Sequence, residues 1–571
     1  MRMRGAATLA VLSLLLTGCT AGGAEPGAEP SQSATTPTGP SEPSEPSPTK
    51  ADDESFSPGL DPDDPSLDVA LSRPVEDRVY PDVGDPGVDA LHYQLDLTWT
   101  AKSEQLEGVE TLTFRATRDA RQFQLDFGRS LRVKSLSLDG EEARFRERGK
   151  DLVVTAPVRA DQRYTLQLHY DGTPRPVAAP TTRSDFSTIG WQITDDAETW
   201  TMQEPFGAYS WYAVNDQPSD KALYDFTLST RSPWVGVANG KLRSRDEEAG
   251  STVTEWHLDE PAASYLVTVA FGDFTMTRDR SKGGVPLTYW TPRGDERSLR
   301  SVRVARDELG WIEDRLGPYP FSSLGFLVVD SDSGMETQTM ITLGDTDYTL
   351  SGAVVVHEMV HQWYGDQVTP RDWRDVWMNE GMAMYLQLLW ESQEFGFPIN
   401  QTLAGWTAED QRLRSSAGPP ANYDPSTFGE GNIYYLPALM WHQLREQLGG
   451  RQFWRLAKAW PRSRDNGNAG YEDITAWWSQ KTGRNLRPMF DRWLLSRQSP
   501  PAADRHARQA ELRFGSGLDG GLGARALPGR RHRHPRRVRA APGGRVARRL
   551  RSGRARQRGL PRQLGGVPCP P

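Results

Sequence analysis

The stretch VVVHEMVHQWY, residues 354–364, is followed by a glutamate, Glu380, with eighteen residues between it and His361. Three valines lead into His357, and the residues from His357 to Tyr364 read as a buried helix. Residues four positions apart lie on one face of a helix, one turn from each other. Both imidazoles of the stretch can therefore reach the same ion.

A second helix is predicted over residues 373–392, and it carries the sequence WMNEGMA at 377–383. Its glutamate, Glu380, can return to the two histidines as a third ligand. Two histidines, one carboxylate and one open position are typical of a catalytic zinc site rather than a closed structural one, so we predict one Zn²⁺ per chain. Glu358 projects beside the ligands and suits a general base and acid. A chance HExxH match is the alternative, and the placement of Glu380 on its own helix argues against it.

HEMVHQWYGD (357–366) together with WMNEGMA (377–383) resembles the aminopeptidase N family of gluzincin metallopeptidases. The third ligand is a glutamate at the spacing of that family, whereas the matrix metalloproteinase type uses a third histidine. The resemblance covers roughly residues 89–499. It implies a zinc-dependent aminopeptidase, a hydrolase that removes N-terminal residues from peptides by means of metal-activated water.

Two further segments resemble substrate-binding parts of the family. Residues 333–337, SGMET, resemble its G-x-M-E-N strand, which implies that Gly334 and Met335 bind substrate and that Glu336 binds its free α-amino group. Residues 201–205, TMQEP, resemble the second amine-facing segment, which gives Glu204 as the partner carboxylate. Two carboxylates around one ammonium are chemically sound, because a cation that leaves water must be paired.

The catalytic tyrosine of the family corresponds to a segment with two tyrosines, NIYYLPALM at 432–440. We align Tyr434 with the tyrosine that stabilises the oxyanion. Leu436 and Pro437 stand where a basic residue and glycine are usual, so Tyr435 stays open as the alternative. Gln387 stands seven residues after Glu380, where the family often has a glutamate, and we expect it to hydrogen-bond a ligating histidine.

Two other functions are compatible with these residues. One is hydrolysis of another small substrate, as in the leukotriene-A hydrolase branch of the family, which opens an epoxide. The other is an inactive, peptide-binding surface lipoprotein with the same fold. The intact Glu358 argues against the second, because a protein that only binds peptides does not need the base.

The N-terminus has the features of an export signal. Two arginines precede an apolar run, Ala6 to Leu16, which is too short to span a membrane in the mature protein. The run ends in LTGC, which resembles a bacterial lipobox, so residues 1–19 are predicted to be a lipoprotein signal peptide with lipidation at Cys19. An ordinary signal peptide with an incidental cysteine is the alternative. We expect an extracytoplasmic protein that is lipid-anchored to the cell membrane, with shedding left open.

The predicted fold is multidomain, β followed by α/β. Residues 20–78 are rich in Pro, Ser and Glu and are predicted to be a disordered linker. Residues 79–275 alternate apolar and polar side chains, with turn signals between the runs, and are predicted to form an all-β domain of antiparallel strands. Residues 276–500 begin with strands and become helical, and the resemblance implies a thermolysin-like catalytic domain there.

The net charge of −8 combines an acidic body with an arginine- and glycine-rich tail over residues 501–571. An acidic body suits recognition of amines and argues against nucleic-acid binding. The tail lacks hydrophobic periodicity. We interpret it as disordered or as the product of a shifted reading frame, with a genuine basic tail as the alternative. The only cysteines are Cys19 and Cys569, so the predicted domains contain no disulfide. We expect a monomer.

Overall fold

The computed structural model describes residues 60–501. The predicted signal peptide with Cys19, the linker up to residue 59 and the tail from residue 502 lie outside the described residues. None of the helices between residues 60 and 501 combines the length and the hydropathy that crossing a bilayer requires.

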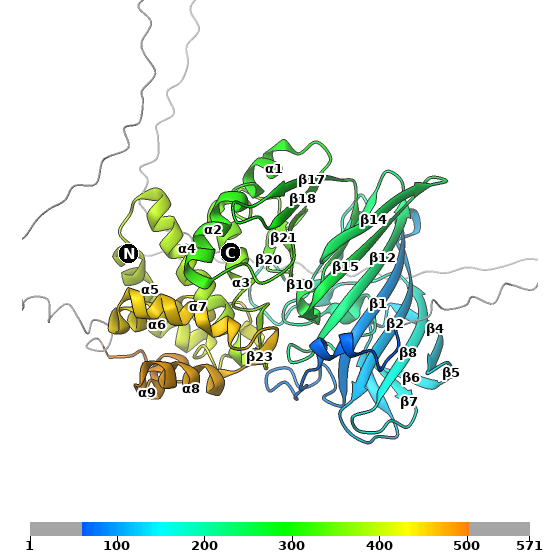
Figure 1. Cartoon of the computed structure of the whole chain (residues 1–571), viewed down its shortest axis with the longest axis horizontal. Coiled ribbons are helices and arrows are strands. Elements are labelled where there is room, and N and C mark those ends of the chain that lie inside the picture. The colour runs from blue at the N-terminus through cyan, green and yellow to red at the C-terminus, as the bar shows by residue number, and fades with distance from the viewer. Residues whose placement is uncertain (1–59, 502–571) are drawn as a thin grey trace, which may run out of the picture. The chain divides into compact units, whose positions relative to one another are not determined.

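The N-terminal domain is built from three sheets, and the largest has eight strands in the order β14-β15-β12-β1-β2-β8-β4-β5 (Figure 1). The strands of the N-terminal domain as a whole are β1 (Val88–Thr100), β2 (Gln105–Ala116), β3 (Phe123–Asp126), β4 (Leu131–Leu138), β5 (Glu141–Glu142), β6 (Arg144–Arg148), β7 (Asp151–Thr155), β8 (Arg163–Gly172), β9 (Val177–Ala178), β10 (Thr188–Ile193), β11 (Thr199–Met202), β12 (Lys221–Arg231), β13 (Val235–Ala238), β14 (Lys241–Glu248), β15 (Ser251–Ala263) and β16 (Val269–Gly272). Short 3-10 turns lie at Pro65–Ala70, Ala101–Ser103, Ala208–Ser210 and Ser264–Leu266. The predicted fold class, a β domain followed by the catalytic domain, is confirmed.

One pair of strands in the large sheet departs from the antiparallel pattern. Strands β1 and β12 run parallel, with Tyr93 opposite Tyr224, while the other pairings of this sheet are antiparallel. A tight turn can join only antiparallel neighbours, and parallel neighbours need a long crossover. Here the chain builds β2 to β11 before it returns to lie beside β1, which no local pattern reveals.

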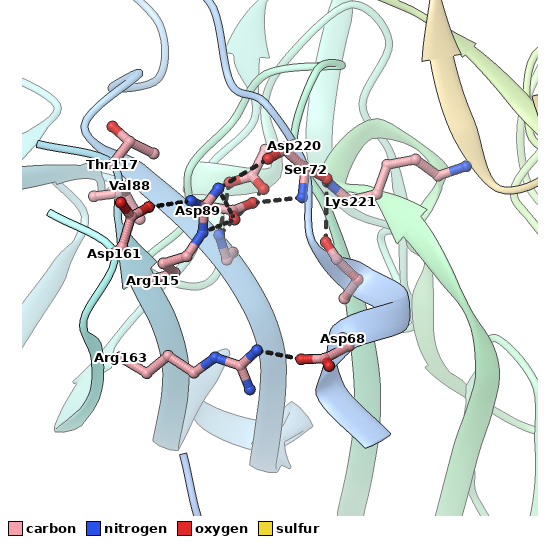
Figure 2. A network of polar contacts seen from close by, with 12 residues as sticks. Asp68, Ser72, Val88, Asp89, Arg115, Thr117, Asp161, Arg163, Asp220 and Lys221 are labelled. Carbon is pink, nitrogen blue, oxygen red and sulfur yellow. Dashed lines mark hydrogen bonds and ion pairs between the residues drawn. The ribbon is translucent and has the colours of Figure 1, made fainter. Parts of the chain in front are cut away.

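The predicted linker extends too far, because residues 60–78 are part of the folded domain. Leu67 and Ala70 pack against the buried Leu91. Figure 2 shows the polar side of this contact, where the buried carboxylate of Asp89 joins the segment to the sheet. Asp89 accepts hydrogen bonds from the backbone N–H of Ser72 at 3.0 Å and from Nε of Arg115 at 2.8 Å. The polar composition suggested disorder, but Leu67 and Ala70 are buried against the sheet and Asp68 forms an ion pair with Arg163.

The catalytic domain begins with β17, just before the predicted boundary at residue 276. A five-stranded sheet in the order β17-β18-β19-β21-β20 precedes the helices that hold the site. Its elements are β17 (Phe274–Arg280), β18 (Pro286–Pro292), α1 (Glu296–Val302), α2 (Ala305–Leu316), β19 (Leu324–Val329), β20 (Gly334–Met335), β21 (Met340–Gly344), α3 (Gly352–His361), β22 (Val368–Pro370), α4 (Trp377–Phe395), α5 (Ile399–Ala417), α6 (Gly431–Leu448), α7 (Gly450–Arg462), β23 (Gly467–Ala469), α8 (Tyr471–Thr482) and α9 (Arg487–Leu494), with 3-10 turns at Trp373–Asp375 and Pro425–Thr427. In Figure 1, α1 and α2 are green and α5 to α9 run from yellow to orange.

The two domains share a hydrophobic core. The cluster that fills the N-terminal domain continues into the catalytic domain through Met335, Trp373, Phe428 and Ile433, all of them buried. Tyr434 packs against this cluster and also against the core of the catalytic domain. Burial of apolar surface is worth about 25 cal/mol per Å², so large side chains shared between two domains hold them together. Residues from both domains are thereby brought to one pocket.

Candidate metal and catalytic site

Helix α3 presents two histidines and a glutamate to the same pocket. The side chain of Ser351 caps its first turn by accepting from the N–H of Val354, and the valines that follow bury the helix. The helix begins earlier and ends earlier than predicted, at Gly352 and His361. His357 and Glu358 are each 7% exposed and His361 is 1% exposed. Their side chains therefore meet almost out of contact with water.

Glu380 of helix α4 lies between the two imidazoles. Its Oε2 is 3.2 Å from Nε2 of His357 and 3.5 Å from Nε2 of His361. A tetrahedral zinc ion with bonds of about 2.0–2.1 Å keeps its ligand atoms about 3.3 Å apart. Both separations from Oε2 of Glu380 are thus close to those that zinc requires, and ligand atoms of the three residues lie within 4.8 Å of one another. The residues present fit the ion.

The opposite nitrogens of the imidazoles are fixed by hydrogen bonds. Nδ1 of His361 is 3.2 Å from the carbonyl oxygen of Tyr364, which can only accept, so Nδ1 carries a proton and Nε2 is the nitrogen that faces Glu380. Nδ1 of His357 is 3.0 Å from Oε1 of Gln387, which confirms the predicted contact. Gln387 in turn donates to Glu391 at 3.2 Å. A partner of this kind orients a ligating histidine and selects its tautomer.

The charges in the site show that it is built for cations. Burial raises the pKa of Glu358 well above its usual value, and the charges of Glu336 and Glu380 add to the shift. Burial also raises the pKa of Glu204, again reinforced by neighbouring carboxylates. Burial lowers the pKa of His361, but the charges of Glu336 and Glu380 outweigh this and hold it well above its usual value. Buried carboxylates that lie this close together either take up protons or pair with positive charge.

Two of these carboxylates, Glu204 and Glu336, lie next to the metal triad. A carboxylate oxygen of each lies within 4.8 Å of the other and of Glu380. Oε1 of Glu204 and Oε1 of Glu336 are buried and have no hydrogen-bond partner among the described residues. An unpaired buried carboxylate oxygen is costly, so each calls for a donor from outside the described residues. The pair thus has the chemistry of a receptor for an ammonium group.

Glu336 follows directly after strand β20, which lies at the edge of its sheet. Gly334 and Met335 of this strand line the same pocket. A Cβ on Gly334 would lie 3.0 Å from Oε1 of Glu358, so a side chain here would press on the general base. An open strand edge beside the catalytic glutamate can pair with the backbone of an extended peptide.

The structure separates the two tyrosines that the sequence left as alternatives. Tyr434 lines the pocket, and its ring centroid is 6.1 Å from that of His357. Tyr435 points elsewhere and stacks on Trp406, with ring centroids 5.0 Å apart and planes at 16°. The geometry therefore favours Tyr434 as the residue that faces the reacting atoms.

The pocket is one cleft that opens to solvent at its mouth. It is lined by Arg183, Asp185, Phe186, Ile189, Met202, Glu204, Asp332, Ser333, Gly334, Met335, Tyr348, Val354, His357, Glu358, Met384, Gln387 and Tyr434. Six of the predicted site residues line the pocket directly: Glu204, Gly334, Met335, His357, Glu358 and Tyr434. The other three within the described range, Glu336, His361 and Glu380, lie next to these lining residues.

Sequence reasoning missed two residues that shape the site. Gln362 follows the second histidine and donates from Nε2 to the carbonyl oxygen of Glu336 at 3.0 Å, which ties the amine-binding strand to helix α3. A buried glutamine beside a ligand was a signal that could have been noticed. Arg183 enters the pocket from a loop of the β domain. A single arginine in a polar loop carries no such signal.

Comparisons with known proteins agree with this geometry. The family model described as the Peptidase M1 N-terminal domain matches residues 89–266, and the Peptidase family M1 domain matches residues 301–493. Aminopeptidase N of Streptomyces lividans is 24% identical over 443 residues, which cover 71% of this chain and 50% of the relative. Probable aminopeptidase 1 of Sulfurisphaera tokodaii is 23% identical over 435 residues, 71% of this chain and 53% of the relative. The chain spans about half the length of these curated relatives.

Solved structures show the same fold. The M1 zinc metallopeptidase from Deinococcus radiodurans superimposes with a TM-score of 0.65 at 24% identity, over 75% of this chain and 98% of the other. A mutant of that enzyme was solved with the peptide Tyr-Ser-Ala bound as substrate.

Proposed function

Because the chain belongs to peptidase family M1, we propose that it is a zinc-dependent aminopeptidase that hydrolyses the N-terminal residue from peptides. One observation carries the proposal. The unpaired carboxylate oxygens of Glu204 and Glu336 lie beside Glu380 of the metal triad, so a free amine bound there places the first peptide bond at the metal. The aminopeptidase names of the relatives and the peptide bound to the Deinococcus radiodurans enzyme support it.

The metal ligands, Glu358 and Tyr434 each have a task in this reaction. Zinc, when held by His357, His361 and Glu380, supplies Lewis acidity that activates water and polarises the scissile carbonyl. Glu358 takes the proton of the attacking water and delivers it to the nitrogen of the leaving amine. The hydroxyl of Tyr434 donates to the oxygen on which negative charge develops. Burial keeps the pKa of Tyr434 well above its usual value, so the hydroxyl retains its proton.

Specificity for a free N-terminus follows from the same carboxylates. A peptide without an ammonium group leaves Glu204 and Glu336 buried and unpaired. A site built to bind a polar group rejects an analogue that lacks it by a factor of about 10⁴. The pocket is therefore expected to act on free N-termini and to exclude internal peptide bonds.

Free and N-acetylated substrates test the proposal. The full chain loaded with zinc should cleave leucine 4-nitroanilide and leave N-acetyl-leucine 4-nitroanilide intact. Glu336→Gln should lower kcat/KM for the free substrate by about a hundredfold or more, because it removes the charged partner of the ammonium. Both are measured by release of 4-nitroaniline.

Glu446→Gln, an exposed change on α6, serves as the matched control and should behave as the unaltered chain does. Equal cleavage of the acetylated substrate would refute the amine-binding roles and indicate an endopeptidase. Absence of cleavage with zinc bound would favour an inactive peptide-binding protein, and opening of an epoxide without peptide cleavage would favour the other hydrolase branch.

We also propose that the protein is anchored outside the cytoplasm by lipid on Cys19. The support is the apolar run that ends in LTGC, because two or more acyl chains hold a protein firmly at a membrane. Cys19→Ser should move the protein from the detergent phase to the aqueous phase in Triton X-114 partitioning. Retention of the variant in the detergent phase would contradict the anchor. Since one chain supplies every site residue, we propose a monomer, which light scattering in detergent would check.

A further inference from the structure

Arg183 is the only lysine or arginine among the described residues that line the pocket. It lies between β9 and β10 and enters from the β domain, whereas the metal triad comes from helices α3 and α4. The reaction proposed above does not use it. It lines the pocket together with Glu358 and Tyr434.

The guanidinium is held rigidly before any substrate arrives. Nε and Nη2 donate to the two carboxylate oxygens of Asp185 at 3.0 and 2.5 Å, and Nη1 donates to the carbonyl oxygen of Gly429 at 3.0 Å. The group also lies over the ring of Phe186, 4.7 Å from its centroid. The side chain of Arg183 is 14% exposed.

The loop that carries Arg183 packs against Gly429 of the catalytic domain. Its φ of +79° lies in the left-handed region, and a Cβ there would lie 2.6 Å from Phe186 and 3.3 Å from Cδ of Arg183. Close by, the N–H of Phe428 donates to the carbonyl oxygen of Pro180 at 3.0 Å, and Oγ1 of Thr181 donates to the carbonyl oxygen of Phe428 at 2.6 Å. The loop is thus seated just before helix α6, which carries Tyr434.

The contacts of Arg183 leave a specific part of its guanidinium free. A guanidinium has five N–H bonds, and the three contacts to Asp185 and Gly429 use one on each nitrogen. One N–H remains on Nη1 and one on Nη2, and neither has a further partner among the described residues. Two N–H groups on the two terminal nitrogens form the fork that binds a carboxylate through both of its oxygens.

The carboxylate side chains that line the pocket disfavour a substrate carboxylate at positions away from Arg183. Glu204, Glu358, Asp185 and Asp332 all line the same cleft. Asp185 is only 3% exposed, so its charge is turned toward Arg183. A substrate carboxylate is therefore accepted at the free edge of Arg183 and repelled at the other acidic positions.

We propose that Arg183 binds the C-terminal carboxylate of peptides of two or three residues, so that the enzyme prefers short peptides held at both ends. The inference rests on the proposed aminopeptidase function, in which Glu204 and Glu336 hold the amino end. Both ends of such a peptide lie within one cleft, because Glu204 and Arg183 both line it. An extended residue spans at most about 3.6 Å, so each added residue moves the carboxylate further from the carboxylates that hold the amino end.

Pairs of peptides that differ only at the C-terminus test this inference. Leu-Gly, Leu-Gly-Gly and Leu-Gly-Gly-Gly-Gly are compared as free acids and as C-terminal amides with the zinc-loaded full chain, by detection of released leucine. We expect kcat/KM for the free acid to exceed that for the amide by about tenfold or more in the di- or tripeptide, since hydrogen bonds to charged groups are the strong ones. The difference should vanish in the pentapeptide.

The variant Arg183→Gln should bring the ratio of acid to amide close to one for every length. Arg175→Gln, an exposed change in the preceding segment between β8 and β9 whose side chain lies outside the pocket, should keep the ratio of the unaltered chain. The ratio is internal to each variant, so a loss of folded protein does not imitate the effect. A ratio that stays high in Arg183→Gln would overturn the assignment to this residue.

The outcomes separate the inference from the function on which it rests. If the unaltered chain cleaves acids and amides equally at all lengths, the carboxylate subsite is refuted while the aminopeptidase stands. If it cleaves neither the peptides nor leucine 4-nitroanilide, the proposed function itself fails and the subsite fails with it.

Discussion

Replacing Glu358 with glutamine is expected to lower kcat by about a thousandfold or more, while each chain still binds one zinc ion. General acid–base catalysis by a positioned side chain contributes typically 10²–10⁴-fold. Glutamine has the same shape, so it preserves the close approach to Gly334, but it cannot take a proton from water. The metal triad of His357, His361 and Glu380 does not include Glu358, so zinc binding is expected to survive.

The measurement combines steady-state hydrolysis of leucine 4-nitroanilide with zinc content by atomic absorption. Glu391→Gln is a useful companion, because that residue lies behind Gln387 and does not line the pocket. It should alter zinc affinity more than the chemical step. Activity of Glu358→Gln within tenfold of the unaltered chain would show that another group transfers the proton. Loss of zinc together with activity would show that Glu358 supports the metal instead.

The chemistry of the site was accessible from the sequence because its metal ligands are local. His357 and His361 are one helical turn apart on α3. Glu380 lies on α4, and only a short strand and a 3-10 turn separate the two helices. Such spacing fixes the geometry before any tertiary contact is known. Glu204 and Glu336 could be named only through the family resemblance, since nothing local links two glutamates so far apart in the chain.

The features that sequence reasoning missed depend on contacts between distant segments. Arg183 meets Gly429 across 246 positions, and β1 meets β12 only after the chain has built the strands between them. The segment before β1 looked disordered because its composition is polar, yet Leu67 and Ala70 complete a small cluster with Leu91. Local patterns report the period of an element and the character of its faces. They do not report which distant surface receives it.

The two adjacent tyrosines show the same limit at the scale of one residue. Successive positions on a helix point about 100° apart, so Tyr434 and Tyr435 cannot both face the pocket. Which one does is decided by the way helix α6 packs on its neighbours. Part of that packing is visible at Gly381, where a Cβ would lie 2.5 Å from Cβ of Pro437. The unusual proline therefore fits directly against the residue after Glu380, and α6 is set close to the metal triad.

Tyr434→Phe is therefore expected to lower kcat by about a hundredfold to a thousandfold, the usual effect of removing one donor to a developing oxyanion. Tyr435→Phe removes the same atom from the neighbouring residue and should leave kcat within about twofold. Its ring stacks on Trp406, and that contact does not need the hydroxyl. Both variants keep the ring, so packing is disturbed little in either. The test compares kcat and KM for leucine 4-nitroanilide.

The way in which the loss divides between kcat and KM identifies the role of Tyr434. A donor that acts only on the transition state lowers kcat and leaves KM nearly unchanged, whereas a donor to the bound substrate raises KM. Because burial keeps Tyr434 protonated, its contribution should not vary across neutral pH, and the ratio of the two variants should be the same at pH 6 and pH 8. A larger loss in Tyr435→Phe than in Tyr434→Phe would reverse the assignment, and it would require helix α6 to turn by about 100° when substrate binds.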